Sequence, residues 1–348
     1  MVRVTFRTIP GEGPLRLVVV GAGEMGRTWL RAIVESPLAD VVGVVDVNEA
    51  AAHAAAPAGA ISGTPLSEVA RRCAPDAVLD VTAPAAHLTV TLEALELGLP
   101  VLGEKPLAAT LPEAVKLVRA AEQAGELFMV SQNRRFHPGL WRLKREISAL
   151  GRVGILTHEF FRAPHFGGFR EVMDHPLVLD MAIHNFDAAR FLLDADPVAV
   201  YCEEYNPPWS WYAGNAATTA VFEMTGGIRF VYTGSWCSPG QETSWNSNWR
   251  VSAESGTATW DGAGAPRTEP TDGQLHREHD DEQAGDRGYP GDDLHGSLAM
   301  FVRALRGGVV PMGECHDNLQ SLAMVHAAIA SAESGTRVSV AEVLRTAG

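Results

Sequence analysis

Hydrophobic and polar positions follow two different rhythms in the first third of the chain. Short, continuous apolar runs rich in β-branched residues occupy residues 15–20, 41–45, 76–81, 100–103 and 127–131. Between the first two runs, Met25, Trp29 and Ile33 recur at helical spacing. Continuous apolar runs are typical of parallel strands that are buried on both faces, and the longer segments between them are typical of crossover helices. The pattern predicts a doubly wound parallel sheet up to about residue 131.

Beyond residue 131 the pattern of hydrophobic and polar residues changes. Helical periodicity covers residues 140–150, 173–193, 294–305 and 318–332, and strand patterns cover residues 153–161, 198–205, 217–225, 228–236 and 248–254. Turns such as Gly226-Gly227 separate the later strands, which indicates antiparallel pairing rather than further crossovers. Residues 262–293 are rich in Gly, Asp, Glu and Pro and are predicted to form a long loop. We therefore expect a Rossmann-type domain at 1–131, then an α+β domain with a large, mostly antiparallel open sheet at 132–348.

The composition narrows the class of protein. With 348 residues, 46% hydrophobic and 20% charged, the chain suits two soluble globular domains. The net charge is −14 without any basic block, which argues against binding to nucleic acid or to anionic membranes. No apolar run reaches the ~18 residues of a membrane span, and the N-terminus lacks a signal-peptide pattern, so a cytoplasmic protein is expected.

The cysteines add to this expectation. Cys73, Cys202, Cys237 and Cys315 are far apart and form no C-x-x-C pair. Such spacing favours a reduced protein and gives no indication of a disulfide framework or a zinc site.

The first strand runs directly into a glycine-rich turn. Residues 21–26 read Gly-Ala-Gly-Glu-Met-Gly, and a helical pattern follows. In a strand–GxGxxG–helix unit Gly21 allows the tight turn, Gly23 lets the backbone approach a pyrophosphate, and Gly26 permits close packing of helix and strand. The motif alone is weak, because glycines also occur in ordinary loops. Its context on both sides predicts a dinucleotide site.

Asp46 ends the second strand, 20 residues after Gly26. A carboxylate at this position can accept hydrogen bonds from the adenosine ribose and repels a 2′-phosphate, so it favours NAD over NADP. The alternative is an exposed aspartate at the end of a strand.

The carboxyl ends of the predicted parallel strands should lie together at one edge of the sheet. Ligands of doubly wound sheets bind beyond the carboxyl ends of the strands, and that edge should carry Gly21, Asp46, Thr82, Glu104 and Gln132. Lys105 follows Glu104 and precedes Pro106, which restricts the local backbone. Taken alone, Lys105 is more simply a solvated surface residue.

Asp180 and His184 are four residues apart in a helical pattern and should share a face. They form either a general-base pair or a plain surface contact, and the residues alone favour the second. A zinc site would need a third ligand, and no motif supplies one, so no metal is expected.

Taken together, these motifs resemble the glucose–fructose oxidoreductase / inositol dehydrogenase / rhizopine catabolism (Gfo/Idh/MocA) family. The resemblance rests on their order and spacing along nearly the whole chain: the glycine motif, Thr-Ala-Pro-Ala-Ala-His at 82–87, Glu-Lys-Pro at 104–106, Gln-Asn-Arg-Arg-Phe-His-Pro at 132–138, and Asp180-x-x-x-His184. It implies an NAD-dependent oxidoreductase that oxidises a secondary hydroxyl of a sugar, inositol or related polyol, or reduces the matching ketone. It also implies a homodimer or homotetramer formed through the C-terminal sheet.

The resemblance also assigns residues. Its catalytic set corresponds to Lys105, Asp180 and His184, with His184 as the base for the hydroxyl proton and Lys105 as the donor to the reacting oxygen. The cofactor set corresponds to Gly21, Gly23, Glu24, Met25, Gly26, Asp46, Val47, Thr82, Ala83, Pro84, His87, Glu104, Lys105 and Asn133.

The substrate wall is less defined. The usual Gly-Gly lead-in to the Asp/His helix is displaced to residues 167–168, and Asn185 stands beside the histidine. Arg162 and His165 are candidate substrate contacts along with the catalytic set. The tryptophans of the second half, such as Trp236 and Trp245, suit either ring stacking or a sheet core.

Two other functions are compatible with the resemblance. The family contains enzymes that use NAD transiently to cleave or eliminate glycosides without net oxidation. A non-enzymatic NAD-sensing regulator is a further alternative, against which the presence of Lys105, Asp180 and His184 argues.

Overall fold

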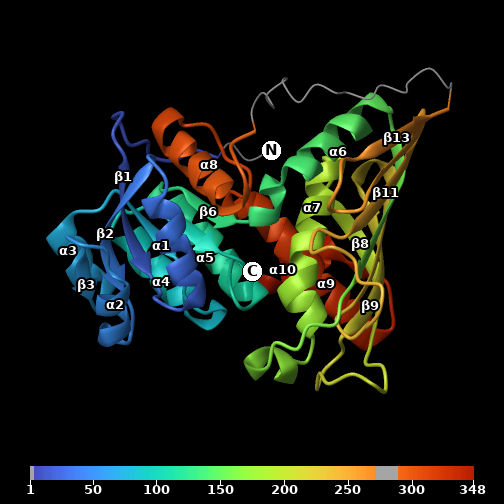
Figure 1. Ribbon diagram of the computed structural model, residues 1–348, viewed down its shortest axis with the longest axis horizontal. Coiled ribbons are helices and arrows are strands. Elements are labelled where there is room, and N and C mark those ends of the chain that lie inside the picture. The colour runs from blue at the N-terminus through green and yellow to red at the C-terminus, as the bar shows by residue number, and fades with distance from the viewer. Residues whose placement is uncertain (1–3, 272–288) are drawn as a thin grey trace. The chain divides into compact units, whose positions relative to one another are not determined.

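The computed structural model describes residues 4–271 and 289–348 (Figure 1). Its contacts divide the chain into two compact units. The first unit comprises Met1–Phe136, Pro290–Leu319 and Ala347–Gly348, and the second comprises His137–Tyr289 and Gln320–Thr346.

The first unit therefore differs from the predicted domain 1–131 by the return of a late segment. Helix α8 (Asp293–Gly307) places Leu298 and Phe301 in one buried cluster with Leu17 and Trp29. The sequence pattern shows that α8 is amphipathic, but the partner for its apolar face becomes apparent only when the chain is folded.

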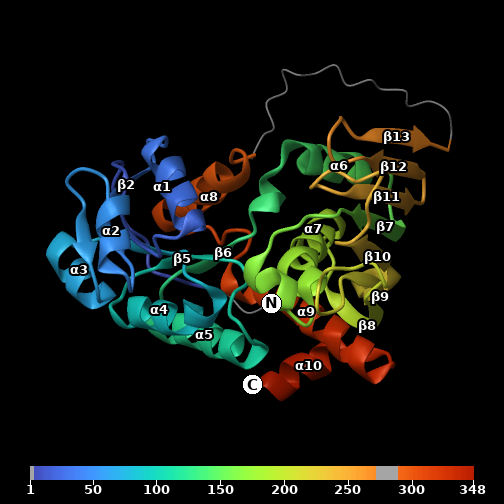
Figure 2. The same ribbon diagram turned by 60° about the horizontal axis from the view of Figure 1, so that its bottom comes forward.

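The sheet of the first unit is parallel, with the strand order β3-β2-β1-β4-β5-β6. The strands are β1 (Leu15–Val20), β2 (Ala39–Val45), β3 (Ile61–Gly63), β4 (Ala77–Asp80), β5 (Val101–Glu104) and β6 (Phe128–Ser131). The helices are α1 (Glu24–Val34), α2 (Glu49–Ala55), α3 (Leu66–Cys73), α4 (Pro84–Glu96), α5 (Leu111–Ala124), the 3₁₀ turn η1 (Asn133–Phe136) and α8. Figure 2 shows α1 and α8 on one face of the sheet and α4 and α5 on the other. This is the predicted Rossmann fold.

Helix α5 illustrates how local sequence builds this unit. Thr110 accepts the backbone N–H of Glu113, and the Glu113 side chain accepts the N–H of Thr110, which is a complete capping box. Gly125 ends the helix with φ of 66°. Leu117, Val118 and Ala121 form its buried face.

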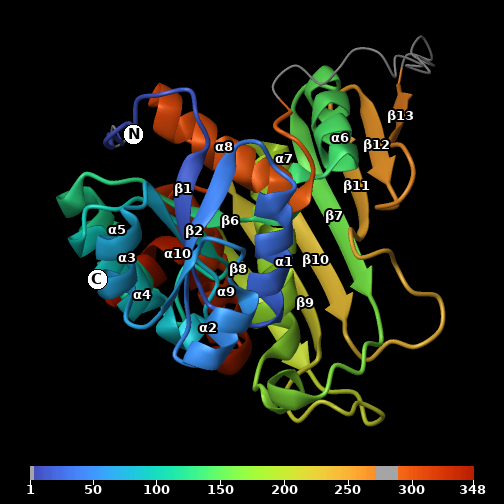
Figure 3. The ribbon, with the colours of Figure 1, turned by 60° about the vertical axis from the view of Figure 1, so that its left-hand side comes forward.

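The second unit is built on an eight-stranded sheet with the order β13-β12-β11-β7-β10-β9-β8-β14. Its strands are β7 (Val153–Phe161), β8 (Pro197–Tyr205), β9 (Ala217–Met224), β10 (Arg229–Ser235), β11 (Asn248–Ala253), β12 (Gly256–Trp260), β13 (Arg267–Pro270) and β14 (Val338–Ser339). Strands β7 and β10 pair in parallel and the other recorded pairs are antiparallel, in agreement with the predicted open, mostly antiparallel sheet (Figure 3).

Helices cover one face of this sheet, as Figure 1 shows for α6 and α7. The helical segments are α6 (Pro138–Ala149), the 3₁₀ turns η2 (Gly168–Val172) and η4 (Thr225–Gly227), the π-helix η3 (Leu177–Ala182), α7 (Ile183–Leu193), α9 (Cys315–Ser334) and α10 (Val340–Ala347). The beginning of α9, up to Leu319, and the last residue of α10 belong to the first unit. Paired residues on the covered face, such as Phe222 and Phe230, are fully buried, whereas Tyr201 and Val221 on the opposite face are 43% and 38% exposed.

Two details differ from the sequence expectations. Strand β13 lies within the segment predicted to be a loop, because its backbone pairs with β12 although its side chains carry no apolar pattern. Residues 272–288 of that segment lie outside the described residues. The helix expected from residue 173 begins at Leu177, and its first part is a π-helix.

Candidate functional site

The glycine turn between β1 and α1 is built by steric exclusion. Gly21 has φ of 106°, and a Cβ on Gly26 would lie 2.0 Å from the Gly21 carbonyl oxygen. A Cβ on Gly23, in contrast, would meet nothing within 4 Å. The protein itself therefore requires Gly21 and Gly26, whereas the space at Gly23 is open at the N-terminus of α1, where a phosphate binds in this kind of turn.

Asp46 joins the end of β2 to this turn. Its Oδ2 accepts the backbone N–H of Ala22 at 2.7 Å, and its Oδ1 accepts the N–H of Asn48 at 2.8 Å. The carboxylate thus holds the glycine turn in place and retains lone pairs for further donors. Val47, beside it, is 97% exposed.

The segment after β4 is held by buried polar contacts. Asp80 accepts hydrogen bonds from the hydroxyls of Thr82 (2.6 Å) and Thr91 (3.1 Å). Burial raises the pKa of Asp80, which His87 and the two hydroxyls oppose. The ring of His87 is 2% exposed, with Nδ1 at 2.8 Å from the carbonyl oxygen of Pro106 and Nε2 at 3.1 Å from that of Thr82.

His87 thereby connects the turn after β4 with the turn after β5. Both of its ring nitrogens face protein carbonyl groups, so the structure gives this residue a positioning role. Ala83 is the N-cap of α4 and Pro84 its first residue, and both precede the first buried residue of the helix, His87.

Lys105 follows β5 directly, in the first unit. The preceding residue, Glu104, accepts the indole N–H of Trp29 at 2.6 Å and the backbone N–H of Lys105 at 3.2 Å. Desolvation raises the pKa of Glu104, and the Trp29 hydrogen bond and the Lys105 charge partly offset this rise. The backbone from which Lys105 projects is thus tied to α1, the helix that follows the glycine turn.

Asn133, the first residue of η1, has a partner within the first unit. Its side-chain amide donates to Asp293 Oδ1 at 2.5 Å. Glu24 and Met25 form the first positions of α1, with Met25 38% exposed.

In the second unit, Asp180 lies in the π-helix η3 and His184 at the second position of α7. Asp180 Oδ2 accepts a hydrogen bond from Arg170 Nε at 2.6 Å, which forms a partly buried ion pair. The side chain of His184 is 8% exposed. π-Helical turns occur often at functional sites, and here one precedes the histidine.

The substrate candidates Arg162 and His165 each rest on a tryptophan. The Arg162 guanidinium lies 4.4 Å from the ring centroid of Trp245 and pairs with Glu242 at 2.8 Å. The His165 ring stacks on Trp211 with centroids 3.7 Å apart. Both side chains are therefore held by aromatic and ionic contacts within the second unit.

Sequence reasoning missed three residues that shape these sites. Arg170 pairs with Asp180, Trp29 holds Glu104, and Asp80 anchors Thr82. Trp29 and Asp80 stand in the predicted helix and strand, so their burial was foreseeable but their partners were not. Arg170 lies in the short 3₁₀ turn η2, where no sequence periodicity shows which way a side chain points.

Comparison with known proteins adds the family. Residues 15–132 match a family described as "Oxidoreductase family, NAD-binding Rossmann fold", and residues 146–259 match its "GFO/IDH/MocA C-terminal domain". The chain belongs to the Gfo/Idh/MocA oxidoreductase family. The first unit is its NAD-binding domain, which confirms the predicted family, fold and cofactor.

The individual relatives of this chain have low sequence identity to it. An uncharacterised protein of Sinorhizobium fredii, y4oX, is 27% identical over 95% of this chain and 97% of its own length. Inositol 2-dehydrogenase of Paracoccus denitrificans is 33% identical over 53% of this chain, and the match spans 56% of that dehydrogenase. The WlbA dehydrogenase of Bordetella pertussis, solved with NADH and UDP-GlcNAcA, has a TM-score of 0.79 at 22% identity, with 95% of this chain and 99% of that chain covered. The last likeness shows a shared fold.

None of the described helices combines the length and the apolar character that crossing a membrane requires.

Proposed function

We propose that this family member is an NAD-dependent dehydrogenase that oxidises a secondary hydroxyl of a sugar, inositol or related polyol, or reduces the matching ketone. The observation that carries the proposal is the position of Lys105. It follows β5 at the carboxyl edge of the same parallel sheet that carries the glycine turn after β1, and Glu104 and Trp29 anchor its backbone. A cation at that edge suits a substrate oxygen that gains negative charge.

The residues of the first unit fit the cofactor. The open space at Gly23 accommodates a pyrophosphate at the N-terminus of α1, and Asp46 accepts from the adenosine ribose. Glu24, Met25, Val47, Thr82, Ala83, Pro84, Glu104 and Asn133 complete the proposed cofactor set, and His87 positions the two turns behind it. NAD, when bound, supplies the hydride acceptor.

Residues of the chain accept the proton of the substrate hydroxyl and stabilise the negative charge that develops on its oxygen. His184 removes the proton of the substrate hydroxyl as the carbinol carbon loses its hydride. Lys105 donates a hydrogen bond to that oxygen and stabilises the alkoxide character of the transition state. Asp180, oriented by Arg170, accepts from a neighbouring substrate hydroxyl, while Arg162 and His165 contact the rest of the substrate.

Relatives support the substrate class. Inositol 2-dehydrogenase acts on a polyol by its name, and the WlbA dehydrogenase was solved with a nucleotide sugar. A polyol or sugar presents several vicinal hydroxyls, which suits the proposed set of one base, one cation and one carboxylate.

The test is NADH formation across a panel of inositols, sugars and sugar acids. We expect turnover with at least one class, a loss of about 10²–10³-fold in Lys105→Met and of about 10²–10⁴-fold in His184→Ala. Calorimetry should show that both variants still bind NAD. The matched controls are Lys116→Met and His295→Ala, which alter exposed side chains on α5 and α8.

Full turnover in both site variants would overturn the assignment of these residues. Release of a glycone or elimination product without NADH accumulation would show chemistry without net oxidation instead. NAD binding without turnover of any substrate would point to a sensor.

The open face of the second sheet suits self-association. Tyr201, Val221 and Val231 pair across β8, β9 and β10 on that face, where Tyr201 and Val221 are 43% and 38% exposed. We propose a homodimer or homotetramer through this face. Val221→Arg should lower the molar mass seen by light scattering and leave NAD binding intact, whereas Val309→Arg, at a 72% exposed site in the first unit, should not. A monomeric wild-type protein would contradict this assembly.

A further inference from the structure

Three consecutive residues at the start of α9 bring three different ligand atoms together. Glu314 Oε1, Cys315 Sγ and His316 Nδ1 all lie within 4.8 Å of one another. Sγ is 3.0 Å from Oε1 and 3.7 Å from Nδ1, and Oε1 is 2.8 Å from Nδ1. Ligand atoms of a tetrahedral zinc site stand about 3.3–3.7 Å apart, so small adjustments would admit an ion at their centre.

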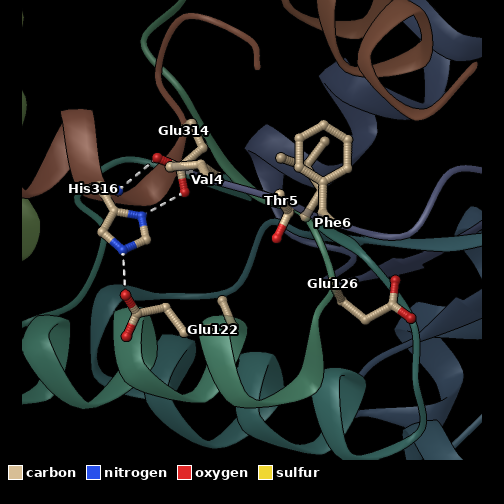
Figure 4. Close-up of a pocket in the computed structure, with 9 residues that line it drawn as sticks. Val4, Thr5, Phe6, Glu122, Glu126, Glu314 and His316 are labelled. Atoms are coloured by element: carbon tan, nitrogen blue, oxygen red, sulfur yellow. Dashed lines mark hydrogen bonds and ion pairs between the residues drawn. The ribbon is translucent and has the colours of Figure 1, made fainter. Parts of the chain in front are cut away.

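The remaining polar atoms of these side chains are already engaged in a supporting arrangement. Glu314 Oε2 accepts the backbone N–H of His316 at 3.0 Å, which leaves Oε1 directed at the cluster. His316 Nε2 lies 2.9 Å from Glu122 Oε1 on α5 (Figure 4). A histidine that ligates a metal through one nitrogen commonly donates the other N–H to a carboxylate, and this carboxylate–histidine contact is present here.

The Cys315 thiol already points at the centre of the cluster. Its Sγ donates to Glu314 Oε1 at 3.0 Å. A metal ion bound between these atoms would replace the thiol proton.

Space for a fourth ligand adjoins the cluster. Glu314 and His316 line a cavity of about 200 Å³, together with Phe6, Glu122 and Glu126 (Figure 4). A polar cavity of this size holds water readily. One carboxylate, one thiolate and one imidazole form a mixed O, S and N set that suits zinc rather than magnesium or calcium.

We propose that Glu314, Cys315 and His316 bind one Zn²⁺, with Glu122 as the partner of the ligating histidine and water from the cavity in the fourth position. Binding releases the Cys315 thiol proton, while the His316 Nε2 proton remains on the hydrogen bond to Glu122. His316 thereby links the ion to α5, and all four residues lie within the first unit. No sequence motif indicated this site, because a contiguous Glu-Cys-His lacks the spacing of the known cysteine and histidine motifs of zinc sites.

The experiment uses the full chain, stripped with a chelator and titrated with CoCl₂ and then ZnCl₂. We expect one equivalent of Co²⁺ to produce a thiolate-to-cobalt charge-transfer band that Zn²⁺ abolishes. Cys315→Ser and His316→Asn should lose the band. Cys73→Ser, which alters another buried free cysteine of the first unit, should keep it.

Glu122→Ala provides a milder variant, because the residue lies near the end of α5 with a side chain 47% exposed. Its zinc affinity, measured by competition with a chromophoric chelator, should fall about 10–100-fold while all three ligands remain. Glu96→Ala, at an exposed position of α4, is the matched control.

The proposal is overturned if the wild-type protein gives no cobalt band, if the band persists in Cys315→Ser, or if Glu122→Ala and Glu96→Ala bind zinc equally well. Each readout is independent of dehydrogenase turnover.

Discussion

The two units of this chain hold their functional side chains in different ways. In the first unit, Asp46 and His87 are tied to backbone groups, and Glu104 to both a backbone amide and a neighbouring helix. In the second unit, Asp180 is held by an arginine side chain and His165 by a tryptophan ring. Hydrogen bonds to backbone groups depend little on the neighbouring side chains, whereas contacts between side chains are particular to this chain, and the proposed substrate contacts are of the second kind.

The largest expected effect is a loss of stability in the first unit, whose glycine turn depends on close backbone contacts. Gly26→Ala places a Cβ against the carbonyl oxygen of Gly21. Because this oxygen is a backbone atom, no side-chain rotation relieves the clash, and the substitution should destabilise the protein by roughly 3 kcal/mol. Gly23→Ala meets no protein atom and should leave the unfolding transition unchanged, but it should weaken NAD binding about 10–100-fold by occupying the space of the pyrophosphate. Chemical denaturation and calorimetry separate the two. Equal NAD affinity in Gly23→Ala and wild type would remove the pyrophosphate from this position.

The next effect concerns the core of the second unit. His158 is fully buried between Tyr232 and Trp249, neither ring nitrogen has a partner among the described residues, and burial lowers its pKa to about 3. Below pH ~6.5 the unfolded chain takes up a proton that the folded protein cannot, so stability falls as the pH decreases toward 3.

His158→Phe should remove this sensitivity. At pH 5 the wild type should have lost about 2 kcal/mol of unfolding free energy relative to the variant. At pH 8 His158 is neutral in both the folded and the unfolded chain, so its protonation makes no contribution. Urea titrations at both pH values measure this difference. Replacement of the exposed His53 by Ala is the control, and parallel pH profiles for wild type and His158→Phe would contradict the buried neutral histidine.

A smaller effect is expected at the ion pair of the second unit. Arg170→Met removes the hydrogen bond and the charge that Arg170 offers Asp180 and should lower kcat/KM about tenfold. The effect is modest because both side chains are partly exposed and solvent screens the pair. Arg152→Met breaks the pair with Glu254, whose side chains are 89% and 53% exposed, and should change nothing measurable. Steady-state kinetics of the two variants distinguish a positioning arginine from a surface charge.

The smallest effect concerns the choice of cofactor. Asp46→Asn keeps a side-chain oxygen for the N–H of Ala22 but removes the charge that repels a 2′-phosphate, and it should improve the kcat/KM ratio for NADP over NAD about fivefold. Asp40→Asn, at an exposed position of β2, should not alter the ratio. An unchanged ratio in Asp46→Asn would mean that another group selects the cofactor.

Several elements could be predicted from sequence because their causes are local. The strand–glycine–helix order, the capping box at Thr110 and the alternation of β9 and β10 depend on residues close together in the chain. Strand β13 was missed, since only its pairing with β12 defines it, and the π-helix before His184 was missed, since helical periodicity does not distinguish π from α over so short a span.

By itself, the sequence determined the NAD-binding fold and the positions at the ends of the parallel strands, because hydrophobic periodicity and glycine sterics act over a few residues. The order and spacing of the motifs indicated the family by resemblance. Only the tertiary structure showed that α8 belongs to the first unit, that Arg170 pairs with Asp180, and that Glu122 faces His316. Glu122 and His316 are separated by 194 residues, and no local rule specifies which distant side chains meet when the core closes. The fold brings them together because burying the apolar faces of α5 and the adjoining strands fixes where their polar neighbours lie.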